Sequence, residues 1–552
     1  MASIHRSPYP DVELDYRSSL TRFLFSHSEG LRTQPSAPCF IDAETGRSFS
    51  FAEVKEKVET VAAGLFSFHS VSKGEVVAIL APNHIEYPLF FHACAHLGAI
   101  TTFINPVYTS YEITHHLQDS GAKYLVTIPA LLPKALPVAK QLCLKQVFTM
   151  SSKESPLALP AQDEAMITTW VQLLEQGAFG TIPDWQVNPV EDVVALPYSS
   201  GTTGLPKGVM LTHFNLVSNL LQAMSLDPLV PDSDDKVNLG LLPFFHSYGM
   251  AVMNGTLLGS SPMVVMGRYD FELLLRTIEQ YKITNAALVP PIVLALAKHP
   301  LARKYNLSSL KRIGSGAAAL GEGVAAEIER QLGCVMSQGF GMTELSPVAI
   351  TNTAKFPNIL ASIGHPIPNT ECMLVDLSTQ QSIDTVNTQG ELWVRGPQVM
   401  KGYHRRPEET RATIDADGWL HTGDVAYVDE KGYFYIVDRI KELIKYKGYQ
   451  VAPAELEALL LKHKKVSDAA VVPSPDAEAG EVPKGFIVRS DPSLTEREIM
   501  AWVAERVAPY KKLRKVEFVS AIPKSVSGKI LRKDLAAKER SQQQPPVKKS
   551  NL

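Results

Sequence analysis

A run of hydroxyl-bearing residues, glycines and one lysine lies near the middle of the chain. Residues 198–209 read Tyr-Ser-Ser-Gly-Thr-Thr-Gly-Leu-Pro-Lys-Gly-Val, directly after the apolar residues 193–196. Glycines let the backbone approach a ligand closely, hydroxyls donate hydrogen bonds and the lysine supplies a cation, so the run predicts a loop that wraps a polyphosphate. It differs from the Gly-x-x-x-x-Gly-Lys-Ser/Thr loop because a proline precedes the lysine and a glycine follows it. The residues predicted to contact phosphate are Ser199, Ser200, Gly201, Thr202, Thr203 and Lys207.

Charged residues that suit phosphate chemistry follow this loop in several short segments. The segments are 338–344, 390–396, 418–439, 441–457 and 523–533, and most contain glycine next to charged residues. A histidine, His246, lies in the apolar run 241–249. Taken alone, such a histidine is more often a satisfied core residue than a reacting one.

Together, these segments resemble the adenylate-forming acyl-CoA synthetase superfamily, and most closely the plant 4-coumarate:CoA ligases and their relatives. The resemblance runs from about residue 40 to residue 533. It implies an AMP-forming acyl-CoA ligase that converts a carboxylic acid, ATP and CoA into acyl-CoA, AMP and diphosphate through an acyl-adenylate. It also implies aromatic acids of the cinnamate or 4-coumarate type, with Mg²⁺ as the metal.

The resemblance assigns roles in the ATP site. Lys529 and the loop 199–207 meet charge that develops at the α-phosphate, and Glu344 binds Mg²⁺. Asp424 accepts the ribose hydroxyls and Arg439 joins it. The remaining ATP contacts implied are Ala317, Gln338 and Gly339 beside the adenine, Thr343 as a phosphate donor, and Lys445 and Gln450 in the adenylation step.

It also assigns the acyl and CoA contacts. His246 lies against the reacting carboxylate, and Lys441 is the hinge about which a small C-terminal domain rotates between the two half-reactions. The other residues implied are Tyr248, Gly314, Gly316, Gly339, Pro347 and Val348 in the acyl pocket, and Arg268, Lys447 and Gly448 at CoA.

The acyl pocket departs from the pattern of the 4-coumarate ligases. Ala319 stands where they usually have proline, Gly314 where many have a larger residue, and Leu345-Ser346 where they have Ala-Gly. Alternatives therefore remain: a peroxisomal ligase of medium-chain or cyclopentenyl fatty acids, or an adenylating enzyme with an acceptor other than CoA. A silent binding protein is disfavoured because Lys207, Glu344 and Lys529 are all present.

The elements that position these residues follow an alternating pattern. Short β-rich runs at 76–80 and 123–128 alternate with helical patterns at 110–117 and 271–281, which predicts an α/β fold of layered subdomains with largely parallel sheets. Residues 151–188 predict a surface connection. Beyond residue 438, helices at 453–463 and 495–507 and strands at 469–472, 485–488 and 516–519 predict a small α+β domain. The predicted domains are 1–438, 439–540 and a flexible tail, 541–552.

Composition bounds the location and the partners. The 552 residues carry a net charge of -3 and five scattered cysteines, which disfavours general nucleic-acid binding and a disulfide framework. No stretch predicts a membrane span, and the amino terminus lacks the apolar core of a secretory signal. The chain ends in Ser-Asn-Leu, close to a peroxisomal address, so we expect a peroxisomal protein that binds the import receptor, with the cytoplasm as the alternative.

Overall fold

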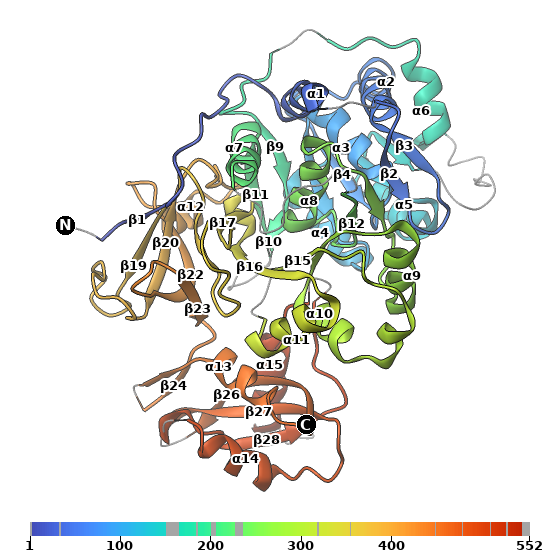
Figure 1. The fold of residues 1–552 in the computed structure, drawn as a ribbon. Helices are drawn as coiled ribbons and strands as arrows, with labels where there is room; N and C mark the ends of the chain where they lie inside the picture. The colour runs from blue at the N-terminus through green and yellow to red at the C-terminus, as the bar shows by residue number, and fades with distance from the viewer. Residues whose placement is uncertain are drawn as a thin grey trace, which may run out of the picture.

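The computed structural model places most of the chain in four sheets and the helices around them (Figure 1). It describes residues 3–31, 35–150, 165–183, 186–199, 206–226, 236–316, 320–353, 355–447, 449–476, 479–507, 509–525 and 528–543. Several predicted features therefore lie outside the described residues: Ser200, Gly201, Thr202, Thr203, Ala317, Ala319, Gly448 and the carboxyl-terminal Ser-Asn-Leu.

The first sheet has nine strands, and six of them run parallel in the order β9-β5-β4-β6-β7-β8. Its central strand is buried along its whole length, as expected for a parallel strand covered by helices on both faces. The antiparallel β10 and β11 extend one edge, and β21 pairs with β11. The strands are β4 (Val76–Leu80), β5 (Ile100–Ile104), β6 (Tyr124–Thr127), β7 (Gln146–Thr149), β8 (Ile167–Thr169), β9 (Val193–Leu196), β10 (Tyr198–Ser199), β11 (Lys207–Thr212) and β21 (Gly402–Tyr403).

The second sheet also has nine strands, with the parallel order β16-β15-β14-β12-β13-β2 at its centre. Antiparallel strands close both edges. The strands are β2 (Pro38–Asp42), β3 (Ser48–Ser50), β12 (Asn238–Gly240), β13 (Met263–Val265), β14 (Asn285–Leu288), β15 (Arg312–Ser315), β16 (Val335–Gly341), β17 (Val348–Thr351) and β18 (His365–Pro366).

Helices cover both parallel sheets. One apolar core lies between the first sheet and α1, α2, α3, α7 and α8, a second between that sheet and α4 and α5, and a third between the second sheet and α9, α10 and α11. The helices are α1 (Leu20–Leu31), α2 (Phe51–His69), α3 (Tyr87–His96), α4 (Ser110–Ser120), α5 (Leu132–Gln141), α6 (Trp170–Gly177), α7 (His213–Met224), α8 (Ser247–Leu258), α9 (Phe271–Tyr281), α10 (Pro290–Lys298), α11 (Glu322–Leu332) and α12 (Pro407–Thr413).

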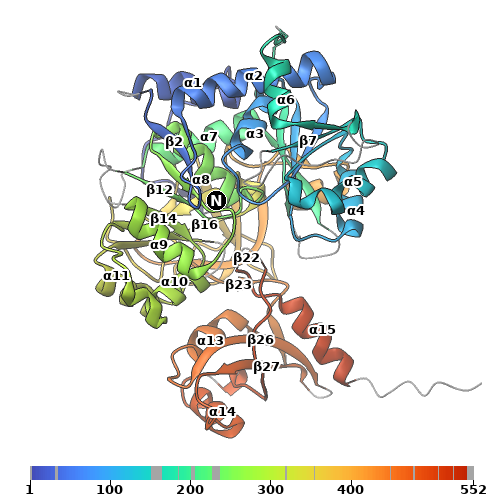
Figure 2. The same ribbon diagram turned by 90° about the vertical axis from the view of Figure 1, so that its right-hand side faces the viewer.

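Two smaller sheets complete the molecule, and Figures 1 and 2 both show the last one below the main body. The antiparallel sheet β1-β19-β20-β22-β23 consists of β1 (His5–Arg6), β19 (Glu371–Val375), β20 (Gly390–Arg395), β22 (Leu420–Val428) and β23 (Phe434–Arg439). The C-terminal module consists of β24 (Ile444–Tyr446), β25 (Tyr449–Val451), β26 (Val466–Asp476), β27 (Gly480–Arg489), β28 (Lys515–Phe518), α13 (Pro453–Leu460), α14 (Glu496–Ala504) and α15 (Arg532–Gln543). It has apolar clusters of its own.

The α/β fold class and most predicted elements are confirmed. Strand β4 and helix α9 begin and end where the sequence places them, and the α+β C-terminal module is present. The prediction of a surface connection over 151–188 is wrong for its described part, because β8 pairs with β7 and α6 packs against α2. The chain passes from β23 to β24 over 440–443, and the domain boundary at 438/439 stays a prediction.

Helix α7 holds distant segments through buried amide side chains. Asn215 Nδ2 donates to the carbonyl oxygens of Pro397 and Val399, each at 2.9 Å. Asn219 Nδ2 donates to the carbonyl oxygen of Val348 at 2.8 Å. Gln222 continues the row and donates to the Pro368 carbonyl oxygen at 2.7 Å. These three amides therefore hold segments of two sheets, among them the first residue of β17, against one helix.

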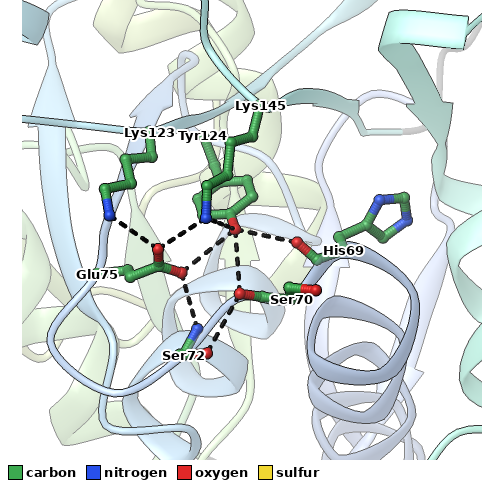
Figure 3. A network of polar contacts seen from close by, with 7 residues as sticks. All are labelled: His69, Ser70, Ser72, Glu75, Lys123, Tyr124 and Lys145. Carbon is green, nitrogen blue, oxygen red and sulfur yellow. Dashed lines mark hydrogen bonds and ion pairs between the residues drawn. The ribbon is translucent and has the colours of Figure 1, made fainter.

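A polar network ties together the ends of α2, β4, β6 and β7 (Figure 3). Glu75 accepts hydrogen bonds from Lys123 at 3.0 Å and Lys145 at 2.9 Å. The Tyr124 hydroxyl lies 3.2 Å from the same carboxylate and 3.0 Å from the His69 carbonyl oxygen. Burial acts to raise the pKa of Glu75, but the hydrogen bonds from the two lysines and the Ser72 backbone lower it overall.

We expect Tyr124→Phe to destabilise the fold without changing catalysis. The ring stays buried, but the hydroxyl that links Glu75 to the helix end is lost, at a cost of about 1–2 kcal/mol in the free energy of unfolding. Urea unfolding would measure the cost. None of the network residues lines the large cavity described below, so a changed kcat or KM would contradict this separation.

Candidate active site

A cavity of about 2320 Å³ lies where the second sheet, the antiparallel sheet and the C-terminal module meet. Its walls bring together most of the described residues predicted for the ATP and acyl sites. Those lining it are Ser199, Lys207, His246, Tyr248, Gly314, Gly316, Gln338, Gly339, Thr343, Glu344, Pro347, Val348, Asp424, Arg439, Lys441 and Lys529.

Glu344 is a buried carboxylate beside the start and end of the phosphate loop. Its Oε1 accepts hydrogen bonds from the Ser199 hydroxyl and the Tyr403 hydroxyl, both at 2.9 Å. Lys207 pairs with Ser199 across β10 and β11, and its Nζ lies 5.0 Å from the centre of the Tyr403 ring. The loop therefore begins at a hydroxyl bonded to this carboxylate and ends at a cation beside the tyrosine that also donates to it.

Asp424 and Arg439 face each other across neighbouring strands. They are paired residues of β22 and β23, and Arg439 Nε lies 3.4 Å from Asp424 Oδ1. Burial raises the pKa of Asp424 to about 6, although Arg439 and Lys529 both oppose the rise. Burial destabilises the charged form of Asp424, so hydrogen bonds donated by a ligand in the cavity would stabilise it.

The pKa of Asp424 gives a prediction on stability. Because the folded-state pKa lies above its ordinary 3.8, the folded chain binds the proton more tightly. The resulting stabilisation is full below about pH 4 and is lost as the pH rises through about 6. We expect Asp424→Asn to be more stable than the parent at pH 7, by up to about 3 kcal/mol, with the gain vanishing towards pH 4. Denaturant unfolding across this range would measure it, and a gain independent of pH would contradict the assignment.

His246 caps the amino terminus of α8 at the cavity wall. Its Nδ1 accepts a hydrogen bond from the Tyr248 backbone N–H at 3.4 Å. Burial lowers its pKa to about 4, and the nearby charge of Lys529 lowers it further. The imidazole is therefore neutral at pH 7 and adds no positive charge to that of Lys529.

A slot floored by glycine lies next to His246. A Cβ at Gly316 would lie 3.0 Å from the Tyr248 ring, and one at Gly314 would lie 3.6 Å from the Tyr248 hydroxyl. Pro347 and Val348 line the same cavity. The slot is therefore filled by the Tyr248 ring, which forms an aromatic wall of the cavity beside His246.

Lys529 reaches the cavity from the C-terminal module. Burial lowers its pKa, and Arg439 lowers it further, while Asp424 and Glu344 oppose the change. The loop before it turns at Gly528, whose φ of 78° favours glycine. A Cβ there would lie 3.2 Å from Pro291 of the main body, so the loop that presents Lys529 packs closely against α10.

Four residues predicted for the site do not line the cavity. Lys445 is exposed on β24 and pairs with Gln450 in the hairpin with β25. Lys447 lies at the turn of this hairpin, where its N–H donates to the Ala479 carbonyl oxygen at 3.0 Å. Arg268 lies 3.7 Å from Glu44 at the surface. Their roles in adenylation and CoA binding stay predictions.

Several residues of the site carried no recognisable sequence signal. Tyr403 on β21 donates to Glu344, and Tyr198 donates to Asp119 at 2.7 Å, which also pairs with Arg406 at 2.9 Å. No motif marks Tyr403, because it meets Glu344 only through the pairing of β21 with β11. Tyr198 opens the predicted phosphate loop, but its bond to Asp119 of α4 has no sequence signal.

An arginine of α15 joins the two sides of the predicted hinge. Arg532 pairs with Glu442, just after Lys441, and with Glu457 of α13 at 2.5 Å. Burial raises the pKa of Glu457, although Arg532 opposes the rise. The turn that contains Lys441 is therefore held by α15 in this arrangement.

The described residues hold no group of three or more His, Cys, Asp and Glu side chains that could bind a metal ion. None of the described helices has the length and apolar character needed to cross a bilayer.

Comparison with known proteins assigns the chain to a family. The model of the AMP-binding enzyme family matches residues 28–404, and that of the AMP-binding enzyme C-terminal domain matches residues 455–529. A 4-coumarate--CoA ligase of Pinus taeda is 42% identical over 97% of each chain. The 4-coumarate--CoA ligase 3 of Arabidopsis thaliana is 40% identical over 97% of this chain and 94% of its own.

Solved structures agree with this assignment. An anthranilate CoA ligase in complex with anthranoyl-AMP superposes with a TM-score of 0.83 at 25% identity, covering 96% of this chain and 98% of its own. ATP-bound MatB from Rhodopseudomonas palustris gives 0.84 at 25% identity, covering 96% and 100%. The chain therefore belongs to the AMP-binding enzyme family, among the AMP-forming acid–thiol ligases that include the plant 4-coumarate--CoA ligases.

Proposed function

We propose that this ligase activates aromatic acids of the cinnamate or 4-coumarate type and joins them to CoA. The observation that carries the proposal is the aromatic wall that Tyr248, packed against Gly314 and Gly316, presents to the cavity shared by His246 and Lys529. The names of its relatives support the same substrate class, since those about 40% identical over nearly the whole chain are 4-coumarate--CoA ligases.

In the proposed first half-reaction, a carboxylate oxygen of the acid attacks the α-phosphorus of ATP and diphosphate leaves. Lys529 supplies a positive charge near the phosphate oxygens, and the loop after Ser199 holds the leaving phosphates. Asp424 accepts hydrogen bonds from the ribose hydroxyls. His246, neutral at pH 7, lies against the carboxylate without neutralising its charge.

In the second half-reaction, the CoA sulfur attacks the carbonyl carbon of the acyl-adenylate and AMP leaves. We propose that Lys447, Gly448 and Arg268 contact CoA after the C-terminal module rotates about Lys441. Adenylation, in contrast, uses the arrangement with Lys529 in the cavity. The exposure of the Lys447 hairpin in that arrangement supports a role at a different stage.

We propose that Glu344 holds Mg²⁺ together with phosphate oxygens and water. The carboxylate is buried at the cavity wall, and two hydroxyls donate to it. Mg²⁺ commonly takes one or two protein carboxylates and completes its shell with substrate phosphates, and it then neutralises part of their charge. The donor set at Glu344 therefore fits this metal.

Isotope exchange between diphosphate and ATP, measured without CoA over a panel of acids, tests the proposal. We expect exchange that requires Mg²⁺ and a cinnamate-type acid, followed by AMP release when CoA is added. Exchange that CoA does not turn into acyl-CoA would instead indicate another acyl acceptor. Folded protein that shows no exchange with any acid would contradict the proposal.

A second substrate class is favoured by the length of the cavity beyond the slot. Gly255, two turns along α8 from Tyr248, also lines it, and a Cβ there would meet no atom within 4 Å. Medium-chain or cyclopentenyl fatty acids would use this extra space. Faster exchange with such acids than with cinnamates would establish this class as the preferred one.

For location, we propose import into peroxisomes through the receptor that reads carboxyl-terminal tripeptides, on the basis of the Ser-Asn-Leu ending. A fluorescent protein fused to the amino terminus leaves this ending free. We expect peroxisomal fluorescence, and cytosolic fluorescence after deletion of residues 550–552. Cytosolic signal from the intact chain would favour the cytoplasm instead.

A further inference from the structure

The cavity continues past the glycine slot between α8 and one face of the second sheet. Tyr248, Val252, Gly255 and Gly259 recur at helical spacing, and all four line the cavity. At 1.5 Å per residue, the distance along the helix from Tyr248 to Gly255 is about 11 Å. The far part of the cavity is therefore a channel that follows the helix away from His246.

The opposite wall of this channel has small residues near the slot. Side chains alternate between the two faces of a strand, and Gly314 faces Tyr248, so its neighbours in register face the channel as well. These neighbours are Ala287 on β14 and Ser337 on β16. These small side chains make the wall shallow, and the Tyr248 ring packs on it at Gly314 and Gly316.

Two residues further from the slot, the same face becomes polar. Arg312 lies two residues before Gly314 on β15 and pairs in register with Asn285 on β14, which pairs with Asn238 on β12. The Asn285 amide donates to Asn238 Oδ1 at 3.4 Å. All three line the cavity, as does Lys236, two residues before Asn238. At about 3.3 Å per residue, the Arg312 position lies about 13 Å from that of Gly316 beside the reacting end.

The positive charge of Arg312 acts on the Tyr248 hydroxyl, which lies in the channel. Burial raises the pKa of the Tyr248 hydroxyl to about 12, and Arg312 acts in the opposite direction. The guanidinium therefore lies near enough to the channel to stabilise negative charge there. An apolar chain end would desolvate these polar groups without offering them an acceptor, whereas an oxygen atom would offer one.

We propose that Arg312, Asn285 and Asn238 form a distal subsite that selects acids carrying a second oxygen acceptor, a ketone or a carboxylate, at the end remote from the reacting carboxylate. This inference rests on the proposed function and extends the acyl pocket beyond the glycine slot. Arg312 is a specificity residue in this assignment, since it contacts the far end of the substrate and not the reacting atoms.

Matched acids test the subsite with the unmodified enzyme. The series consists of unbranched acids of several lengths, each ending in a methyl group, a methyl ketone or a carboxylate, and the measurement is acid-dependent diphosphate exchange. At the length that reaches the subsite, we expect kcat/KM to be at least about tenfold higher for an oxygen-bearing acid than for its methyl-ended match. If the dicarboxylic acid gains more in kcat/KM than the ketone does, the subsite selects for negative charge. If the two acids gain equally, it selects for a hydrogen-bond acceptor. No advantage at any length would overturn the proposal.

Variants of the subsite sharpen the test. Arg312→Met should remove the advantage, Arg312→Gln should keep part of it, and the KM for ATP should stay unchanged in both. Arg303→Met, the same change at an exposed arginine outside the cavity, is the matched control and should keep the full advantage. An advantage that survives Arg312→Met in folded protein would overturn the role of Arg312.

A change on the helical wall gives an independent measurement. Gly255→Leu should fill the channel between the slot and the subsite, so long oxygen-bearing acids should lose activity while cinnamate-type acids keep theirs. Equal loss for both classes would contradict the path of the channel. Complete absence of exchange with every acid in the unmodified enzyme would instead contradict the proposed function itself, so the two failures are distinguishable.

Discussion

Lys529→Ala is expected to slow formation of the acyl-adenylate by about 10²–10³, the loss typical of removing one preorganised group that stabilises developing charge. The lysine lies in the cavity close enough to Asp424, Glu344 and Arg439 for their charges to change its pKa. Diphosphate exchange without CoA would measure the loss. Thioesterification of supplied acyl-adenylate should stay nearly normal if the C-terminal module rotates Lys529 away for that step.

Lys447→Ala is the matched control for this prediction. Lys447 belongs to the same module but lies on the exposed hairpin of β24 and β25 and does not line the cavity. We expect it to leave diphosphate exchange unchanged and to weaken only the CoA-dependent step. Single-turnover measurements of each half-reaction separate these effects. Equal damage to both half-reactions by both variants would rule out a division of labour between two arrangements.

Gly249→Ala is expected to have a large effect on folding. A Cβ at this position would lie 2.0 Å from the Pro243 carbonyl oxygen and 2.9 Å from that of Leu242. Neither backbone atom can move without displacing the segment that carries His246, so we expect a loss of at least about 3 kcal/mol in the free energy of unfolding. Diphosphate exchange should fall as well, because the first turn of α8 positions His246.

Gly255→Ala tests the same substitution on the same helix where there is space. No atom lies within 4 Å of a Cβ at Gly255, and alanine favours a helix interior by about 1 kcal/mol over glycine. We therefore expect this variant to be as stable as the parent or more so. Denaturant unfolding of both variants gives the comparison, and similar losses in both would contradict the packing described for Gly249.

Strong local patterns explain why much of the fold was predictable. The strand 76–80 is a continuous apolar run, and the helix 271–281 follows an aspartate whose side chain caps it. Strand β8 and helix α6 escaped prediction because they are short and lie in a weakly periodic stretch. Their structure depends on pairing with β7 and packing against α2, which local sequence does not show.

Some residues of the candidate site were likewise predictable from the sequence, and others were not. Residues in extended motifs, such as Glu344 and Asp424, were predictable from their neighbours in sequence. Tyr403 and Arg312 were not, because each is a single residue whose importance comes from strand pairing. No motif distinguishes an arginine at a channel end from one at the surface, and only the register of β14 and β15 does so.

The buried amide side chains of α7 change which substitutions this helix should tolerate. Asn215, Asn219 and Gln222 stand at i, i+4 and i+7, the spacing that usually marks an apolar face, yet their side chains are buried and bonded to carbonyl oxygens of other segments. Hydrophobic replacements of similar size would leave those carbonyls without donors. A saturation screen should therefore find a helix whose intolerant face is polar, and engineering that fills its core positions with leucine would loosen segments up to 184 residues away in sequence.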